Sequence, residues 1–259
     1  MNNLFDLRGE RILVTGAGGS IGGATARVCA ALGAELFIAD LKAPTELGSE
    51  LKARAAALDN TRRDDVEALV KDIGHLDALI DASGYYVKGD WLDGGDEWDE
   101  LFARTMAINV RGPMNLVRAV LPQMRARGAG VVVNVTSSVT YKPLPLVGVY
   151  RAAKAAVNAF TESLASEVEP FGVRVRLVLP GSSGETRFRD TARTRLRGMD
   201  DAVYGEFMRQ TIARMAESTG PGTRMQDVAE AVWRAATDPS APLRLPAGAD
   251  AVQWAAEAG

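Results

Sequence analysis

The sequence is poor in the residues that disulfides, metal sites and membrane spans require. Its 259 residues include one Cys and one His, so an intramolecular disulfide is impossible and a metal site built from thiolates lacks its ligands. No run of about 18 apolar residues occurs, which argues against a membrane-spanning helix. The polar first ten residues lack the apolar stretch of a secretory signal. These absences predict a cytoplasmic protein with no bound metal and no membrane partner, and we expect the lone His75 at the surface.

An excess of positive charge is missing as well. Lys and Arg number 30 against 33 Asp and Glu, for a formal net charge of −3. Because neutralising nucleic-acid phosphates takes clustered cations, we expect no nucleic-acid partner. Apolar residues make up 47% and charged residues 24%, as in ordinary soluble domains. With no repeat and no Pro-, Gly- or Ser-rich linker, residues 1–259 are predicted to form one domain.

Short runs rich in β-branched residues alternate with stretches of helical periodicity. The expected strands are Arg11–Thr15, Glu35–Asp40, Asp77–Asp81, Gly130–Val135, Val173–Leu179 and Pro242–Leu245, and a weaker helix–strand pair spans Thr45–Leu58. The expected helices are Ser20–Leu32, Asp64–Ile73, Trp98–Arg111, Pro113–Arg127, Tyr150–Glu169 and Gln226–Ala236. This alternation predicts an α/β fold: a doubly wound, Rossmann-like parallel sheet of about seven strands with helices on both faces. Ligands of such folds bind outside the carboxyl ends of the strands.

A glycine-rich turn follows the first expected strand. Glycine lets the backbone approach a ligand closely, and the helix start behind it offers free N–H groups to a pyrophosphate. The residues expected to hold that group are Gly16, Gly19, Ser20, Ile21 and Gly22. The simpler interpretation is a tight strand–helix turn without a ligand. Asp40, at the end of the second strand, favours the dinucleotide because a carboxylate there can accept the ribose hydroxyls of NAD.

Asp40 also bears on the choice between NAD(H) and NADP(H). A carboxylate repels a 2′-phosphate, and no Arg or Lys occurs between Thr15 and Gly23 to attract one. Lys42 is the only cation that the sequence pattern places nearby. NAD(H) is therefore the favoured cofactor.

A second constellation joins Ser137, Tyr150 and Lys154. Tyr150 and Lys154 are four residues apart on one expected helix and so share a face. An ammonium close to a phenol lowers the phenol pKa and makes proton transfer near neutral pH easier. An isolated Tyr-x-x-x-Lys is usually a surface pair. Ser137, just past the Gly130–Val135 strand, favours a catalytic role, because its hydroxyl can bond the same substrate oxygen.

With these motifs in place, the chain resembles a short-chain dehydrogenase/reductase from about Leu7 to Gly181. The resemblance implies a tetrad of Asn109, Ser137, Tyr150 and Lys154, in which Asn109 holds a water in a proton relay. It implies Asp59 and Asn60 beside the adenine. Further cofactor contacts are expected from Ala82, Ser83, Gly84, Pro180, Gly181 and Thr186, together with Tyr150 and Lys154.

Several positions depart from the usual family pattern. Ser20 stands at a glycine position, and the Gly16, Gly19, Gly22 spacing resembles longer, epimerase-like relatives. Asp81 occupies a place where Asn is usual, so its carboxylate must find other donors. Ala153 replaces a frequent Ser. The C-terminal part lacks the usual Val-Asp-Gly-Gly ending.

The sequence thus predicts an NAD(H)-dependent oxidoreductase that interconverts a secondary alcohol and a ketone, with a small-molecule substrate. A sugar-nucleotide epimerase or dehydratase and a non-catalytic NAD-binding regulator remain alternatives. A homodimer or homotetramer is expected, and residues 182–222 are expected to form a substrate lid. The cations that follow Thr186 either attract an anionic substrate or form a solvated helix face; they are Arg187, Arg189, Arg193, Arg195 and Arg197.

Overall fold

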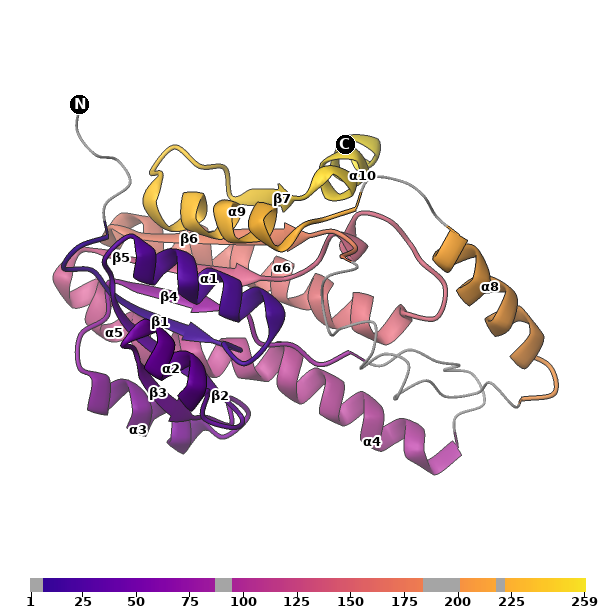
Figure 1. Cartoon of the computed structure of the whole chain (residues 1–259), viewed down its shortest axis with the longest axis horizontal. Helices are drawn as coiled ribbons and strands as arrows, with labels where there is room; N and C mark the ends of the chain where they lie inside the picture. The colour runs from indigo at the N-terminus through magenta and orange to yellow at the C-terminus, as the bar shows by residue number, and fades with distance from the viewer. Residues whose placement is uncertain (1–6, 87–94, 184–200, 218–221) are drawn as a thin grey trace.

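A seven-stranded parallel sheet forms the centre of the molecule (Figure 1). The computed structural model describes residues 7–86, 95–183, 201–217 and 222–259. The strands are β1 (Arg11–Thr15), β2 (Glu35–Asp40), β3 (Arg54–Ala57), β4 (Ala78–Asp81), β5 (Gly130–Val135), β6 (Val173–Pro180) and β7 (Arg244–Ala247). They lie in the order β3-β2-β1-β4-β5-β6-β7 with parallel pairing throughout. The predicted α/β class and doubly wound sheet are confirmed.

Helices cover both faces of this sheet. They are α1 (Ser20–Ala31), α2 (Thr45–Leu51), α3 (Arg63–Ile73), α4 (Gly95–Met106), α5 (Gly112–Arg127), α6 (Gly148–Val168), α8 (Gly205–Glu217), α9 (Met225–Thr237) and α10 (Ala249–Ala258). A π-helical turn, η1 (Ala107–Arg111), joins α4 to α5, and short 3₁₀ turns, η2 (Ser138–Thr140) and η3 (Glu169–Phe171), flank α6. One apolar core lies between the sheet and α1 with α9, the other between the sheet and α3, α5 and α6.

The strand β1 shows why these runs are apolar at consecutive positions. Ile12 and Val14 pack into the core under α1 and α9, whereas Leu13 between them packs into the core on the opposite face. A strand covered on both faces has no side that contacts solvent, so apolar and polar residues do not alternate along it. The same reasoning applies to Val131–Val133 of β5, where neighbours alternate between the two cores.

The chain order reverses between β1 and β4. From β1 the chain builds outward through β2 and β3, then returns to place β4 on the other side of β1. Thr15 and Asp81, the last residues of the two strands, are in register. In Figure 1 the strand ends point to the same side of the molecule as α8. The carboxyl ends of β1 and β4 therefore form the topological switch point at which such sheets bind ligands.

Some expected boundaries are corrected by the structure. The last strand is Arg244–Ala247 and not Pro242–Leu245, and the helix expected over Trp98–Arg111 begins at Gly95 and ends in the π turn. The helices α8 and α10 were not predicted from the sequence. His75 is exposed, as expected, with 55% of its side chain accessible.

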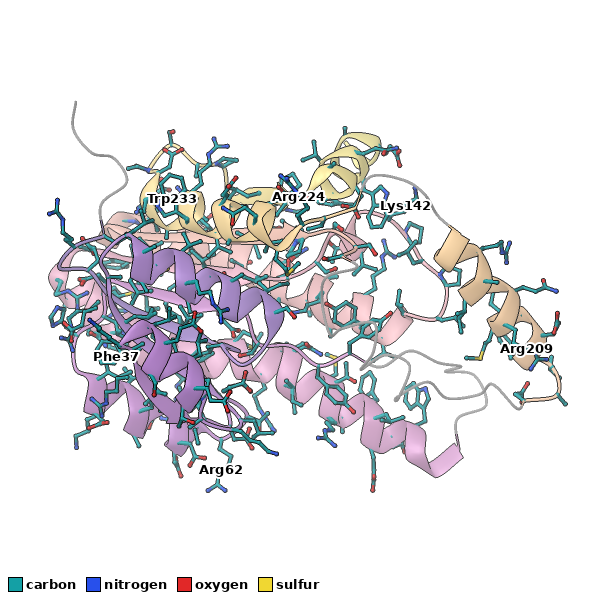
Figure 2. The ribbon with its side chains drawn as sticks, in the orientation of Figure 1. Phe37, Arg62, Lys142, Arg209, Arg224 and Trp233 are labelled. Carbon is teal, nitrogen blue, oxygen red and sulfur yellow. The ribbon has the colours of Figure 1, made fainter. Side chains whose placement is uncertain are left out.

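Charged side chains lie mostly on the outside of the helical layers; Figure 2 labels Arg62, Arg209 and Arg224 among them. Within the part of the chain that the structure describes, no helix is long and apolar enough to cross a membrane. No group of three or more His, Cys, Asp or Glu side chains in that part could hold a metal ion.

Candidate active site

The glycine-rich turn leaves β1 through a backbone that tolerates no side chains at two positions. Gly16 has a positive φ of 70°, and a β-carbon there would lie 2.6 Å from the backbone of Ala82. A β-carbon on Gly22 would overlap the carbonyl oxygen of Gly16. The turn is closed by the Gly19 amide, which donates to the Gly16 carbonyl over 3.0 Å. These contacts bring the start of α1 against the end of β4.

The start of α1 suits a pyrophosphate. Its N-cap, Gly19, makes no side-chain capping hydrogen bond, and no acidic residue lies in the first turn to neutralise the positive end of the helix dipole. Such a terminus attracts anions through its N–H groups and its dipole. The predicted contacts Ser20, Ile21 and Gly22 form this first turn, so the residues present fit a dinucleotide.

Asp40 ends β2 beside this turn. One of its carboxylate oxygens accepts the Gly18 amide over 2.9 Å and the other accepts the Leu41 amide over 2.7 Å. A β-carbon on Gly18 would lie only 3.0 Å from the same carboxylate. The carboxylate is thereby fixed in position, and each oxygen keeps capacity for a further donor.

Asp81, which stands where the family usually has Asn, accepts hydrogen bonds from two donors. The Thr15 hydroxyl donates to it over 2.7 Å and the Ser83 amide over 3.0 Å. The group is almost fully buried, with 2% of its surface exposed. These bonds lock the segment after β4, which holds the predicted residues Ala82, Ser83 and Gly84, to the end of β1.

Asn109 occupies the π-helical turn η1 and is completely buried. Its side-chain oxygen accepts the Tyr85 amide over 2.9 Å, while its side-chain nitrogen donates to the carbonyls of Tyr85 and Thr105. A π turn inserts one extra residue and is frequent at functional sites. Here it brings Asn109 beside the segment that follows β4.

Lys154 lies in the same buried region, on α6. Its ammonium donates to the Val135 carbonyl over 3.2 Å and sits 5.9 Å from the ring centre of Tyr150. A β-carbon on Gly84 would make ordinary contacts with both the Asn109 oxygen, at 3.7 Å, and the Lys154 nitrogen, at 3.8 Å, so the segment after β4 lies directly beside these two side chains. Burial lowers the pKa of Lys154 to about 8, and the Asp81 carboxylate opposes that shift.

Tyr150 is buried one helical turn before Lys154. Burial raises the pKa of its phenol above the ordinary value, the neighbouring Tyr86 phenol adds to the rise, and a hydrogen bond with Ser137 lowers it. The expectation that Lys154 lowers this pKa is not met in the protein alone. The Lys154 ammonium is turned toward the Val135 carbonyl, and burial of the phenol is the largest influence on its pKa.

Aromatic and apolar side chains surround the Tyr150 ring. The ring of Tyr86 stands edge-on to it, with the ring centres 4.9 Å apart. Val139 and Val147 complete a small buried cluster, and Leu144 packs against it. The Ser137 hydroxyl also accepts the Val139 amide over 3.2 Å, which fixes the side chain at the start of η2. The tetrad residues are thus brought together by three separate elements.

The end of β6 is held by a cluster that the sequence did not reveal. We name Ser182, Thr223 and Asp250 the C-terminal clasp. Asp250, in the first turn of α10, accepts the Ser182 amide and the Thr223 hydroxyl, each over 2.6 Å. The Thr223 amide in turn donates to the Ser182 carbonyl over 3.0 Å. A side chain on Gly181 would overlap the Asp250 carboxylate, so the clasp fixes the predicted Pro180–Gly181 segment.

The pair expected beside an adenine lies after β3. Asp59 accepts both the amide and the hydroxyl of Thr61, which closes a local turn. Asn60 is buried and packs so close to Gly112 that a side chain there would overlap it. Its carbonyl accepts the Asn115 side chain over 2.9 Å. Thr186 and the arginines that follow it lie outside the described residues, as does about half of the expected lid.

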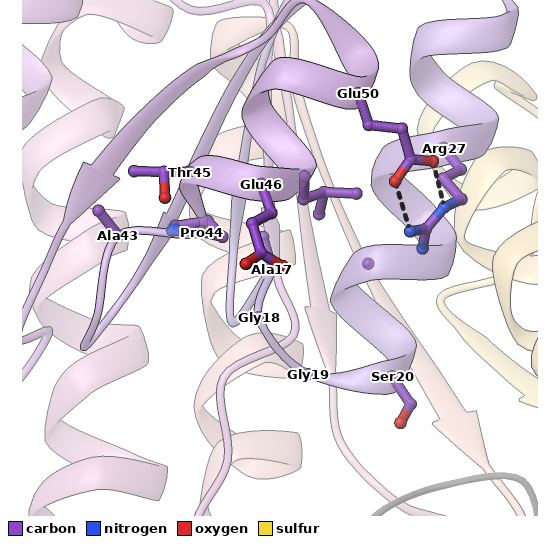
Figure 3. Close-up of a pocket in the computed structure, with 12 residues that line it drawn as sticks. Ala17, Gly18, Gly19, Ser20, Arg27, Ala43, Pro44, Thr45, Glu46 and Glu50 are labelled. Carbon is purple, nitrogen blue, oxygen red and sulfur yellow. Dashed lines mark hydrogen bonds and ion pairs between the residues drawn. The ribbon is translucent and has the colours of Figure 1, made fainter.

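A pocket of about 480 Å³ opens on the outer side of the glycine-rich turn (Figure 3). It runs between Ala17–Ser20 and the stretch from Ala43 through α2. The sequence pattern offered Lys42 as the only cation near this turn, but Arg27 lines the pocket and Lys42 does not. Arg27 could have been predicted near the turn from the sequence, because it lies four residues after Gly23 and therefore on the same face of α1.

Comparison with known proteins agrees with this geometry. The family model for short chain dehydrogenase matches residues 10–196. An uncharacterized oxidoreductase of Thermotoga maritima is 35% identical over 188 residues, which cover 69% of this chain and 74% of the relative. A short-chain dehydrogenase from Streptomyces avermitilis superposes with a TM-score of 0.79 at 27% identity, covering 96% of this chain and 92% of that one.

An NAD+-bound xylitol dehydrogenase is a further structural neighbour. It has a TM-score of 0.75 and 26% identity, with coverage of 93% of this chain and 98% of the neighbour. The family match spans well over half of the chain, the fold agrees along nearly all of it, and the site geometry lies at the expected strand ends. The chain therefore belongs to the short-chain dehydrogenase family of oxidoreductases.

Proposed function

We propose that the protein is an NAD(H)-dependent oxidoreductase that interconverts a secondary alcohol and a ketone, built as one domain over residues 1–259. The observation that carries this proposal is the meeting of Tyr150, Ser137 and Lys154 next to the switch point between β1 and β4. A protein that only sensed the cofactor would need the glycine-rich turn but not a buried phenol bonded to a serine hydroxyl.

Each member of the tetrad has a role that follows from its surroundings. The Tyr150 phenol moves the proton of the substrate oxygen, and Ser137 binds the same oxygen. Lys154 would hold the nicotinamide ribose, and its ammonium together with the positive charge of an oxidised nicotinamide would favour the Tyr150 phenolate. Asn109 supports the segment after β4 and holds a water for proton relay. The bound nicotinamide supplies or accepts the hydride.

The cofactor side rests on the contacts around Asp40. Its carboxylate, fixed by the Gly18 and Leu41 amides, is positioned to accept the hydroxyls of the adenosine ribose. Asp59 and Asn60 would border the adenine. The start of α1 would hold the pyrophosphate, and Pro180, Gly181 and Thr186 would border the nicotinamide. Solved structural neighbours include a xylitol dehydrogenase with NAD+ and a short chain dehydrogenase from Burkholderia cenocepacia with NADP, so they support a nicotinamide dinucleotide, and the proposed preference for NAD(H) rests on Asp40.

The assembly is proposed to be a homodimer or homotetramer formed through α6. The small residues Ala155 and Ala159 are exposed one turn apart on this helix, and small side chains let two symmetric helices approach closely. Light scattering that gives a mass near one chain of 27.6 kDa would contradict this. Residues 182–222 are proposed as the substrate lid, and the cytoplasm as the location.

The experiment is a panel of secondary alcohols screened for NADH absorbance, followed by Tyr150→Phe with the best substrate. Loss of a positioned acid or base costs about 10²- to 10⁴-fold in rate, so kcat should fall by at least that much while NAD affinity stays within about twofold of wild type. Tyr141→Phe is the matched control, because its phenol interacts with Arg244 and not with the tetrad. A Tyr150→Phe enzyme with wild-type turnover would remove the tetrad assignment and favour another active site or a regulator.

A further inference from the structure

The pocket outside the glycine-rich turn adjoins the site proposed for the adenosine ribose. Gly18, one of its lining residues, donates its amide to Asp40. A group attached to the 2′ oxygen of a ribose bound by Asp40 would therefore face this pocket. The charges of the side chains that line the pocket therefore influence whether a cofactor with a 2′-phosphate can bind.

Three charged side chains line the pocket, and two of them are acids. The cation is Arg27, whose Nε and Nη2 donate to the two oxygens of Glu50, each over 2.8 Å. Figure 3 shows this two-pronged pair between α1 and α2, with the Glu46 side chain directed toward the glycine-rich turn. The lining thus has a net charge of −1, which repels a phosphate.

The Arg27 guanidinium lies within reach of the helix start. Its Nη1 would be 3.5 Å from a β-carbon on Gly23, so the side chain folds back along α1 toward the turn. A guanidinium binds carboxylates and phosphates with the same two-pronged geometry. Glu50 therefore occupies the donors that a phosphate would use.

We propose that Glu50 is a specificity-determining residue that withholds Arg27 from a phosphate on the adenosine ribose, and so reinforces Asp40 in the choice of NAD(H). The inference rests on the proposed function, because it takes the adenosine site to lie at Asp40. It differs from a purely structural role, in which the pair only ties α1 to α2. Both partners are about half exposed, at 54% and 50%, and exposed pairs of this kind contribute little to stability. A structural role would therefore leave the ratio of the two affinities unchanged.

The test is calorimetric titration of NADH and NADPH into the full-length protein and three variants. Glu50→Gln keeps the shape of the side chain, removes one negative charge and releases Arg27. NADPH affinity should rise about threefold to tenfold at low salt, the size expected of one partly screened charge, while NADH affinity stays within about twofold. The gain should shrink as salt is raised, since exposed charges are screened.

Two further variants separate the possible causes. Arg27→Gln combined with Glu50→Gln should lose the gain in NADPH affinity. Glu67→Gln, which breaks the similarly exposed Arg63–Glu67 pair on α3 away from the pocket, should change neither affinity. An unchanged ratio in Glu50→Gln, or a gain that persists without Arg27, would overturn the inference. If either result were found while the wild-type protein still bound NADH more tightly than NADPH, the role of Glu50 would be rejected and the proposed function would remain. A wild type that binds NADPH more tightly would overturn both.

Discussion

The glycine-rich turn and the C-terminal clasp fix the ends of two strands of the same sheet, β1 and β6, by opposite means. In the turn, Gly16 and Gly22 carry no side chains, so that the backbone of Gly22 touches Gly16 and that of Gly16 touches Ala82. In the clasp, one buried carboxylate ties Ser182 and Thr223 to α10. The glycines of the turn lie close together in sequence, although Gly16 packs against the distant Ala82, whereas the clasp joins side chains and backbone up to 68 positions apart. The glycines that permit close backbone packing can thus be recognised from the local sequence, while a side-chain tie can be supplied from anywhere in the chain.

The largest loss of stability is expected when the close backbone contact of the turn is disturbed at Gly22. Its φ is not in the left-handed region, so Gly22→Ala acts only through the overlap of the new methyl group with the Gly16 carbonyl oxygen. Overpacking against a backbone atom that cannot rotate away should cost about 3 kcal/mol or more of unfolding free energy. NAD affinity should fall with it. Urea unfolding and NAD titration measure the two effects.

Gly148→Ala serves as the control for that variant, because nothing lies within 4 Å of its added methyl group. It should leave the unfolding free energy nearly unchanged. If Gly22→Ala proved as stable as Gly148→Ala, the tight backbone contact in the turn would be contradicted.

The next largest effect concerns the buried charge of Lys154. Its folded pKa is about 8, against 10.5 for the exposed group. Below pH 8 the ammonium is charged in both states, and the folded state carries the full cost of burying it. Between pH 8 and 10.5 the unfolded chain binds more protons, so stability rises with pH, and above 10.5 the cost is gone.

Lys154→Met removes this cost and should stabilise the protein without cofactor by up to about 3 kcal/mol below pH 8. The advantage should shrink as the pH is raised through 8 toward 10.5, while NAD binding and turnover are lost. Thermal unfolding across this pH range measures it, with the exposed Lys142→Met as control. A stability difference that does not change with pH would contradict the buried ammonium.

The smallest expected effect is at the clasp. Asp250→Asn keeps the shape and one acceptor, so the bond from Thr223 or the bond from Ser182 is lost but not both. Loss of one buried hydrogen bond should lower the unfolding free energy by about 1–2 kcal/mol. Asp72→Asn, on α3 with 61% of its side chain exposed, is the control.

A role in placing the Pro180–Gly181 segment adds a second readout. In Asp250→Asn, kcat should fall several-fold while KM for the alcohol changes less, because the segment borders the proposed nicotinamide site and not the substrate oxygen. Thr223→Val should act in the same direction. A stability loss without any change in kcat would reduce the clasp to a structural tie.

Local pattern sufficed for the strands and for much of the candidate site. The boundaries of β1, β2 and β5 agree with the predicted Arg11–Thr15, Glu35–Asp40 and Gly130–Val135, because strands buried on both faces are continuous apolar runs. The four-residue spacing of Tyr150 and Lys154 placed both on α6, and Asp81 was expected to need other donors and has them in Thr15 and Ser83. These inferences depend on periodicity and on contacts close to a strand end.

Tertiary structure alone decided the remaining features. The reach of Asp250 to Ser182 and of Arg27 to Glu50 depends on how α10 and α2 pack, which no periodicity specifies. The π turn that brings Asn109 to Tyr85 joins α4 to α5 and packs against α6, which lies far along the chain. Even the sign of the Tyr150 pKa shift follows from burial, because desolvation depends on everything that surrounds a group and not on its neighbours in the sequence.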